Sequence, residues 1–302
     1  MKIKDHFLTQ EEFELQETNI PGVLKTYPIP ENIGKYYESK DYISHHQDSG
    51  SLKEQLYKLL QKFNLKYKKN IVQKAFPLSP KGGKNAKEHH IDENNNNIPP
   101  SGDGGTQKLV LDYGCGAGEF VKFIAEDFKT FGFEPNENAR KFAQQKSPKT
   151  TFLSSPTLSE IEDGSLDLIT LWHVFEHIEN QSEMLSVFHR KLKPNGKLII
   201  AVPNHTSYDG QKYKAFWAAY DVPRHIFHFS REGMLRLMNN KDWQVENIAP
   251  LLLDSYYISM LSEKYRKNPL FWLFGGVHGA ISNFKALKTG EFSSLIYTVG
   301  KI

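Results

Sequence analysis

Leu109-Val110-Leu111-Asp112-Tyr113-Gly114-Cys115-Gly116-Ala117-Gly118 joins an apolar run, an acid and three alternate glycines. The apolar run predicts a buried strand over 109–113, and the apolar spacing that follows predicts a helix over 118–127. Glycines between them permit positive φ angles and close approach of the backbone. A strand, a glycine loop and a helix N-terminus together form a binding site, because backbone N–H groups and the helix dipole face the ligand.

The spacing of the glycines narrows the choice of ligand. The dinucleotide fingerprint is G-x-G-x-x-G, whereas this chain has G-x-G-x-G with Asp112 two residues before the first glycine. A second acid, Glu134, lies 22 residues after Asp112, at the end of an apolar segment over 130–133. An acid in that position can accept both ribose hydroxyls of an adenosine. The alternative for Glu134 is a residue that caps the helix expected over 136–145.

This pattern resembles the first motif of the class I S-adenosylmethionine-dependent methyltransferases. The resemblance implies that S-adenosyl-L-methionine is the methyl donor, and that Asp112 binds its ammonium end while Glu134 binds its ribose. A purely structural carboxylate is the alternative for Asp112. The implied donor-binding residues of the motif are Asp112, Gly114, Cys115, Gly116, Gly118 and Glu134.

Composition indicates a cytoplasmic protein. The net charge is +3, from 38 basic and 35 acidic residues, without a dense basic patch, so nucleic acid is not an expected partner. One cysteine excludes an intramolecular disulfide framework and suits a reducing compartment. No signal-peptide core follows Met1, and the apolar stretch 270–281 falls short of the roughly 20 residues that span a bilayer. The oligomeric state stays open.

The chain divides into three regions. Residues 1–76 are expected to form an N-terminal helical cap, with a helix over 51–65, and residues 77–107 a flexible low-complexity linker or insertion. Residues 108–302 alternate strand and helix, which predicts a doubly wound α/β fold with a mostly parallel, seven-stranded Rossmann-like sheet. Segments 203–229 and 251–292 are then insertions that form a lid. The expected strands are 109–113, 130–133, 150–153, 167–171, 197–202, 243–249 and 294–299; the expected helices are 118–127, 136–145, 181–192 and 230–240.

A third motif, Trp172-His173-Val174-Phe175-Glu176-His177, follows the fourth of these strands. It resembles the fourth-strand motif of the ubiquinone-biosynthesis O-methyltransferase-like family, some of whose members hold a divalent ion with an acid and a histidine here. His173 stands where those relatives have an acid, so no metal ligand is assigned. The motif also matches the H-x-x-E-H pattern of zinc peptidases, which leaves a metal-dependent hydrolase using His173, Glu176 and His177 as an alternative.

Two further segments are candidates for the acceptor site. Residues 217–230 bring His225 and His228 over the carboxyl edge of the expected sheet, together with aromatic and acidic groups. The tyrosine-rich segment 36–45 resembles a segment of a Bacteroidetes-type branch of the family, although the Cys-x-x-Cys pair of that branch is absent. In the family picture this segment folds over the cofactor, which implies a cation–π contact of Tyr37 or Tyr42 with the sulfonium.

The sequence therefore predicts methyl transfer from S-adenosylmethionine to an unidentified acceptor, either a small molecule or a lipid- or sugar-linked one. His173 is the first candidate for the base, followed by His225 and His228, because an imidazole of pKa about 6.5 suits that task. A second possibility is a catalytically inactive S-adenosylmethionine-binding regulatory domain.

Overall fold

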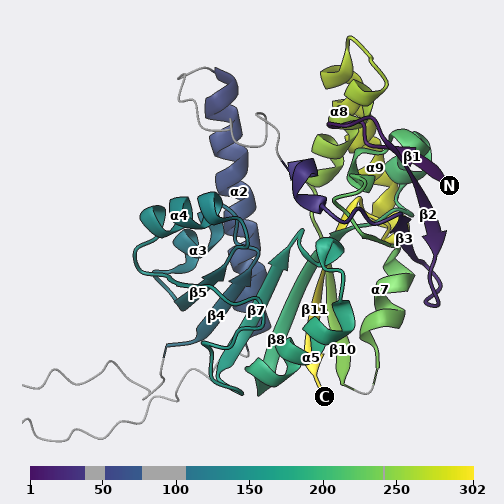
Figure 1. Ribbon diagram of the computed structural model, residues 1–302. Helices are drawn as coiled ribbons and strands as arrows, with labels where there is room; N and C mark the ends of the chain where they lie inside the picture. Colours follow the sequence, from purple (N-terminus) through teal and green to yellow (C-terminus); the bar gives the residue numbers. More distant parts are fainter. Residues whose placement is uncertain (38–51, 77–106, 241) are drawn as a thin grey trace, which may run out of the picture.

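The computed structural model describes residues 1–37, 52–76, 107–240 and 242–302 (Figure 1). Its central sheet has seven strands in the order β10-β11-β8-β7-β4-β5-β6. The pairs among β8, β7, β4, β5 and β6 are parallel, and β11 runs antiparallel to both of its neighbours. The expected sheet is thereby confirmed. Its strands are β4 (Leu109–Tyr113), β5 (Lys129–Phe133), β6 (Thr151–Leu153), β7 (Leu166–Trp172), β8 (Leu192–Pro203), β10 (Trp243–Pro250) and β11 (Ser294–Lys301).

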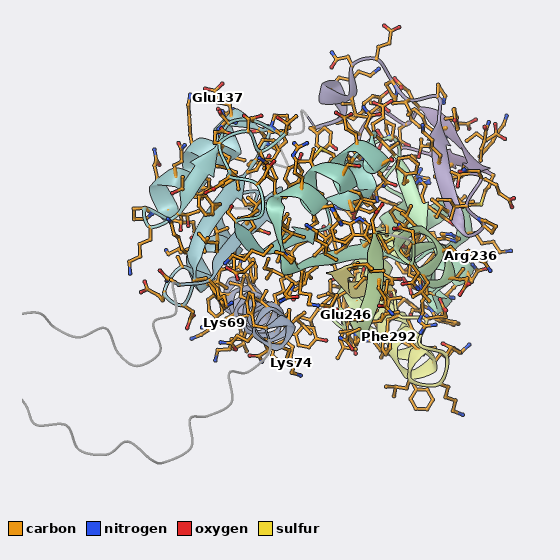
Figure 2. The ribbon with its side chains drawn as sticks, turned by 90° about the horizontal axis from the view of Figure 1, so that it is seen from below. Lys69, Lys74, Glu137, Arg236, Glu246 and Phe292 are labelled. Atoms are coloured by element: carbon orange, nitrogen blue, oxygen red, sulfur yellow. The ribbon has the colours of Figure 1, made fainter. Side chains whose placement is uncertain are left out.

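Helices cover both faces because neighbouring residues of a buried strand point to opposite sides. Val110 and Leu168 face a core that includes Ile71 of α2 (Leu52–Ala75) and Phe120 of α3 (Glu119–Ile124). The next residue of each strand faces a second core, shared with α5 (Gln181–Lys191) and α7 (Arg231–Met238). Figure 2 shows α2 nearly end-on beside the sheet, marked by Lys69 and Lys74. The remaining helix of this part is α4 (Glu137–Lys146).

The N-terminal region contains more strand than a helical cap. Strands β1 (Lys2–Lys4), β2 (Glu12–Glu17) and β3 (Val23–Tyr27) form an antiparallel sheet that ends on β9 (Phe227–Phe229), which the first insertion contributes. In β2 the buried Phe13 and Leu15 alternate with exposed glutamates, the pattern of a half-buried strand. A short helix η1 (Ile33–Tyr37) follows. The expected helix over 51–65 corresponds to α2, which extends ten residues further, to Ala75.

The two insertions lie with this small sheet at the carboxyl ends of the parallel strands (Figure 1). A third apolar core joins them, and it includes Leu15, Trp217, Tyr220 and Ile258. The first insertion forms α6 (Tyr208–Tyr213), η3 (Lys214–Phe216), η4 (Ala218–Tyr220) and β9; the second forms α8 (Asp254–Tyr265) and α9 (Phe271–Thr289). Within the described residues no helix is both long and apolar enough to cross a membrane.

Candidate active site

The loop after β4 needs glycine at three positions, all of which have positive φ and two of which have no room for a Cβ. Gly114, Gly116 and Gly118 have φ values of 78°, 53° and 78°, a region that other residues rarely adopt. A Cβ on Gly114 would lie 2.4 Å from Val174 Cγ2, and one on Gly118 would lie 2.8 Å from Ala143 Cβ. A Cβ on Gly116 would meet nothing within 4 Å. Gly114 and Gly118 therefore permit close packing, whereas Gly116 borders open space.

Glu134 fixes this loop from the end of β5. Its Oε2 accepts the N–H of Gly116 at 2.9 Å, and its Oε1 accepts the N–H of Asn136 at 2.9 Å. Glu134 is half-buried, and each of its carboxylate oxygens keeps a second lone pair for a ligand hydroxyl. Cys115 contributes only its backbone, because its side chain is buried and burial raises the pKa of the thiol.

Asp112 is buried at the end of β4 and accepts the hydroxyl of Thr170 at 2.6 Å. Burial raises the pKa of Asp112 to about 7, while the Thr170 hydrogen bond and the charge of Lys68 act in the opposite direction. Lys68 comes from α2, and its Nζ lies 4.6 Å from the centre of the Trp172 ring. A cation and an acid thus share the side of the loop next to β7.

His173 directly follows β7, in a left-handed conformation with φ 56°. Its Nε2 lies 2.9 Å from Asp254 Oδ2 of α8 and its Nδ1 lies 3.5 Å from Glu176 Oε1. Burial alone would lower the pKa of His173, but the two carboxylates raise it to about 10. His173 is consequently an imidazolium at neutral pH. The expectation that it is the base does not agree with this state, since a protonated ring cannot accept a proton.

His177 and His225 both present a lone pair to Glu176. Nδ1 of His177 donates to Arg224 O at 2.8 Å and Nδ1 of His225 donates to Ala219 O at 2.9 Å, since a carbonyl can only accept. The proton on Nδ1 leaves each Nε2 as an acceptor. Burial and the neighbouring His177 lower the pKa of His225 to about 4, so this ring is neutral.

The carboxylate of Glu176 has no hydrogen bond among the described residues, although the residue is fully buried. One ligand atom each of Glu176, His177 and His225 lie within 4.8 Å of one another. A buried carboxylate without a hydrogen bond and two imidazoles match the donor set of a divalent transition metal. These three residues therefore fit a divalent ion such as some relatives hold at this motif, with His225 of the first insertion as the third ligand.

His228 does not belong to this group. The hydroxyl of Thr26 donates to His225 O at 2.8 Å, so it must accept the Nε2–H of His228, also at 2.8 Å. Burial lowers the pKa of His228 well below its ordinary value. The ring is a neutral donor that links β9 to β3, and its expected role as a base does not fit this position.

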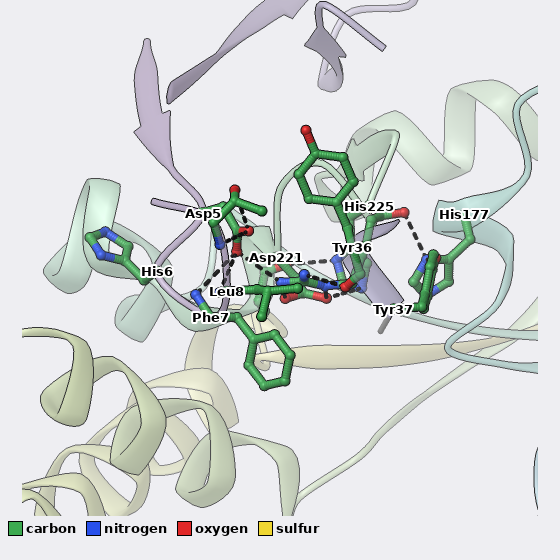
Figure 3. Close-up of polar contacts among 12 residues, drawn as sticks. Asp5, His6, Phe7, Leu8, Tyr36, Tyr37, His177, Asp221 and His225 are labelled. Carbon is green, nitrogen blue, oxygen red and sulfur yellow. Dashed lines mark hydrogen bonds and ion pairs between the residues drawn. The ribbon is translucent and has the colours of Figure 1, made fainter. Parts of the chain in front are cut away.

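Arg224 joins the N-terminal loop to the first insertion through Asp5 and Asp221. Its guanidinium is 3 % exposed and makes two hydrogen bonds to Asp221, at 2.6 and 2.9 Å. It also donates to Asp5 at 3.2 Å and to Tyr36 O at 3.0 Å. Figure 3 shows Tyr37 beside His177, where the two side chains lie 3.1 Å apart, whereas Tyr42 falls outside the described residues.

A cavity of about 1460 Å³ opens beside the histidine cluster. His173, Asp254 and His225 line it, together with Lys264 at the end of α8 and Arg266 directly after it. The glycine loop is adjacent, because Gly114 packs on Val174, the residue after His173. Sequence patterns did not single out Lys68. Asp254 begins a segment, Asp254–Tyr257, that resembles the Bacteroidetes-type branch, but it was given no role in the site, since folding alone brings both residues to the end of β7.

Fold and site together define an α/β domain with a glycine-rich loop after its first parallel strand and an adjoining cavity. Residues 67–248, more than half of the chain, match the model of the methyltransferase domain family, to which this chain therefore belongs. The resemblance to S-adenosylmethionine-dependent methyltransferases is thereby confirmed.

Relatives with curated descriptions match over part of their length. A ubiquinone biosynthesis O-methyltransferase from Rickettsia bellii is 31% identical over 163 residues, which cover 47% of this chain and 64% of the relative. An uncharacterized methyltransferase from Alkaliphilus oremlandii is 28% identical over 111 residues, 36% of this chain and 50% of that protein. The chain spans about half the length of the curated relatives it matches.

Among solved structures, a putative methyltransferase in complex with the Haloferax volcanii Trm112 activator aligns with a TM-score of 0.48 and 17% identity, covering 65% of this chain and 82% of that one. Geranyl diphosphate C-methyltransferase from Streptomyces coelicolor aligns with a TM-score of 0.45 and 14% identity, covering 67% of this chain and 72% of that one.

Proposed function

We propose that this chain transfers a methyl group from S-adenosylmethionine to an acceptor bound in the cavity beside His173. The observation that carries the proposal is that the glycine loop and the cavity adjoin each other. The glycine loop, fixed by Glu134, packs on Val174, and the cavity begins at the preceding residue. A donor on the loop and an acceptor in the cavity would therefore meet at the end of β7.

The donor is assigned to the residues around the loop. Glu134 accepts the ribose hydroxyls with its free lone pairs, and the open space at Gly116 admits the nucleoside. Asp112 complements the ammonium group of the donor, and Lys68 complements its carboxylate. Tyr42 remains a prediction for the sulfonium contact.

The reaction is an in-line displacement. The bond between the methyl carbon and sulfur breaks as a bond to the acceptor forms, and the sulfonium becomes the neutral thioether of S-adenosylhomocysteine. The protein has to align the two reactants and exclude water. The His173 imidazolium, held by Asp254 and Glu176, orients the acceptor. His225 takes the acceptor proton where one is released, because it is the neutral imidazole that lines the cavity and carries a lone pair.

A divalent metal would be held by Glu176, His177 and His225. When bound, it would occupy the Nε2 lone pair of His225, and its Lewis acidity, which lowers the pKa of an acceptor hydroxyl, would then take the place of His225 as the base. The metal-dependent hydrolase alternative loses its basis, because His173 directly follows a strand and residues 175–177 form only a three-residue 3₁₀ turn. The two histidines of that motif do not share the face of a helix.

Calorimetry with S-adenosylhomocysteine tests the donor site. Glu134→Ala removes two charge-assisted hydrogen bonds, each contributing about 1.5–3 kcal/mol, so the Kd should rise about a hundred-fold or more. Glu137→Ala is the matched control, because Glu137 is an exposed residue in the first turn of α4 that pairs with Lys141. Equal affinities for the two variants would refute the assignment.

A labelled-methyl transfer screen on cell extract separates an enzyme from a binding domain. Donor binding without any labelled product would favour the regulatory alternative. His225→Gln should lower turnover while donor affinity stays unchanged, since His225 acts only on the acceptor.

A further inference from the structure

Helix α9 packs with its small residues inward. Gly275, Gly279, Ser282 and Ala286 are buried and recur at helical spacing. A Cβ on Gly275 would lie 2.4 Å from Met260 Cα, and one on Gly279 would lie 2.7 Å from Tyr256 Cα. The backbones of α8 and α9 are therefore in direct contact, and the large apolar residues of α9 point outward.

The outward side of α9 carries large apolar side chains from Leu273 to Leu287. Leu273, Val277, Phe284 and Leu287 are 45, 47, 68 and 74% exposed and lie opposite the small residues. At the start of the helix Phe271, Trp272 and Phe274 are exposed as well. Soluble monomers rarely expose such a continuous patch, so an occupant is implied.

Positive charge surrounds this apolar surface. Lys264 in the last turn of α8 is exposed, as are Arg266 and Lys267 in the turn that follows, and Lys285 and Lys288 lie further along, on α9. Between residues 255 and 290 the sequence holds a single acid, Glu263, which is buried and lies 3.5 Å from Arg266. The hairpin is thus a cationic surface with an aromatic tip.

Charge decides between two occupants. A second copy placed by a two-fold axis would set these cations against each other, which is unfavourable. An anionic lipid surface would neutralise them, while Trp272 and its apolar neighbours enter the headgroup region. Figure 1 shows the hairpin projecting from the end of the molecule toward which the parallel strands point.

The cavity connects this surface to the histidine cluster. Lys264, Tyr265 and Arg266, at and directly after the end of α8, line the same cavity as His173 and Asp254. An acceptor whose tail stays in the bilayer could extend its head from the α8 end to the donor.

We propose that the α8–α9 hairpin docks the chain on an anionic membrane surface and that the acceptor is a lipid-linked molecule which enters the cavity beside the hairpin. The second part rests on the proposed function. Docking is interfacial, through one face of α9 and the turn that precedes it.

Co-sedimentation of the full chain with vesicles tests the docking. Vesicles of equimolar phosphatidylcholine and phosphatidylglycerol should bind the protein, and phosphatidylcholine alone should bind it at least about ten-fold more weakly. Trp272→Ser with Phe274→Ser should weaken binding about ten-fold or more. Lys264→Gln with Lys267→Gln should weaken it about thirty-fold at low salt. Phe142→Ser, on the distant helix α4, is the control for an exposed aromatic residue and should change nothing.

Three results would overturn the docking. One is no binding of the wild-type chain to anionic vesicles, and another is equal binding by the double serine variant. The third is a wild-type dimer that the serine variant converts to a monomer, since a second copy would then cover α9. Calorimetry of donor binding separates the two proposals. Vesicle binding without donor binding would refute only the proposed function, whereas donor binding without vesicle binding would refute only the docking.

Discussion

The charge of His173 makes a specific prediction about stability and pH. An imidazole in the unfolded chain has a pKa of about 6.5, and the carboxylates of Asp254 and Glu176 raise the folded pKa to about 10. Because the folded pKa is the higher one, the stabilisation is complete below pH 6.5 and is lost as pH rises toward 10. A difference of about 3.5 pKa units corresponds to at most about 4.8 kcal/mol.

The expected magnitude is smaller than this maximum. The His173 side chain is 33% exposed and solvent screens the ion pair, so about 2–3 kcal/mol is expected. Urea unfolding of the wild type and of His173→Gln at pH 6, 8 and 10 measures it. The difference in the free energy of unfolding should fall from about 2–3 kcal/mol at pH 6 to near zero at pH 10. Titrating groups that do not interact with His173 cancel in the difference.

Asp254→Asn gives an independent check on the same ion pair. It removes the largest interaction that raises the pKa of His173, so the ring should titrate closer to its ordinary value. The assignment of a charged His173 would be refuted if the difference in the free energy of unfolding between the wild type and His173→Gln did not vary with pH. So would an NMR titration of His173 with a midpoint near 6.5.

Three further predictions concern other parts of the site. Divalent zinc or cobalt should raise the melting temperature of the wild type, and Glu176→Gln should abolish the shift; an unchanged shift in that variant would place the ion elsewhere. Arg224→Met should cost about 3–5 kcal/mol in urea unfolding, because it removes the only cation that hydrogen-bonds to Asp221 and the buried Asp5 among the described residues, while Asp5 keeps the hydrogen bonds from its own loop; a loss below 1 kcal/mol would contradict the geometry. Gly116→Ala should cost only about 1 kcal/mol of stability yet abolish donor binding, whereas Gly118→Ala should destabilise more because its Cβ meets Ala143; thermal melts with calorimetry distinguish the two.

Local patterns sufficed for the central sheet and the donor loop. The apolar strands and the glycine spacing around 114–118 depend on neighbouring residues, so a single sequence reveals them. The acid at Glu134 was recognisable because its distance from Asp112 is set by one strand–helix–strand unit. The strands before Tyr27 were missed, although Phe13 and Leu15 alternate with acids, because that alternation covers only four residues.

Groups that arrive from distant segments could not be found in this way. Asp254 lies 81 residues after His173, and Lys68 lies 105 residues before His173. Only the folded chain places both around the end of β7. Glu176, His177 and His225 meet because the first insertion returns over the sheet. Their contacts depend on packing of the third apolar core, which no local pattern encodes.

The three histidines proposed as bases show why a residue type does not determine a role. His173 lies among carboxylates and is charged, whereas burial keeps the other two neutral. His225 gives its proton to a carbonyl and keeps a lone pair at Glu176, but His228 gives its proton to Thr26 because that hydroxyl is already donating to His225 O. The hydroxyl hydrogen of Thr26 therefore decides that His228 donates to Thr26 and joins two strands. Among the three histidines, only His225 combines a neutral ring, an available lone pair and contact with the cavity.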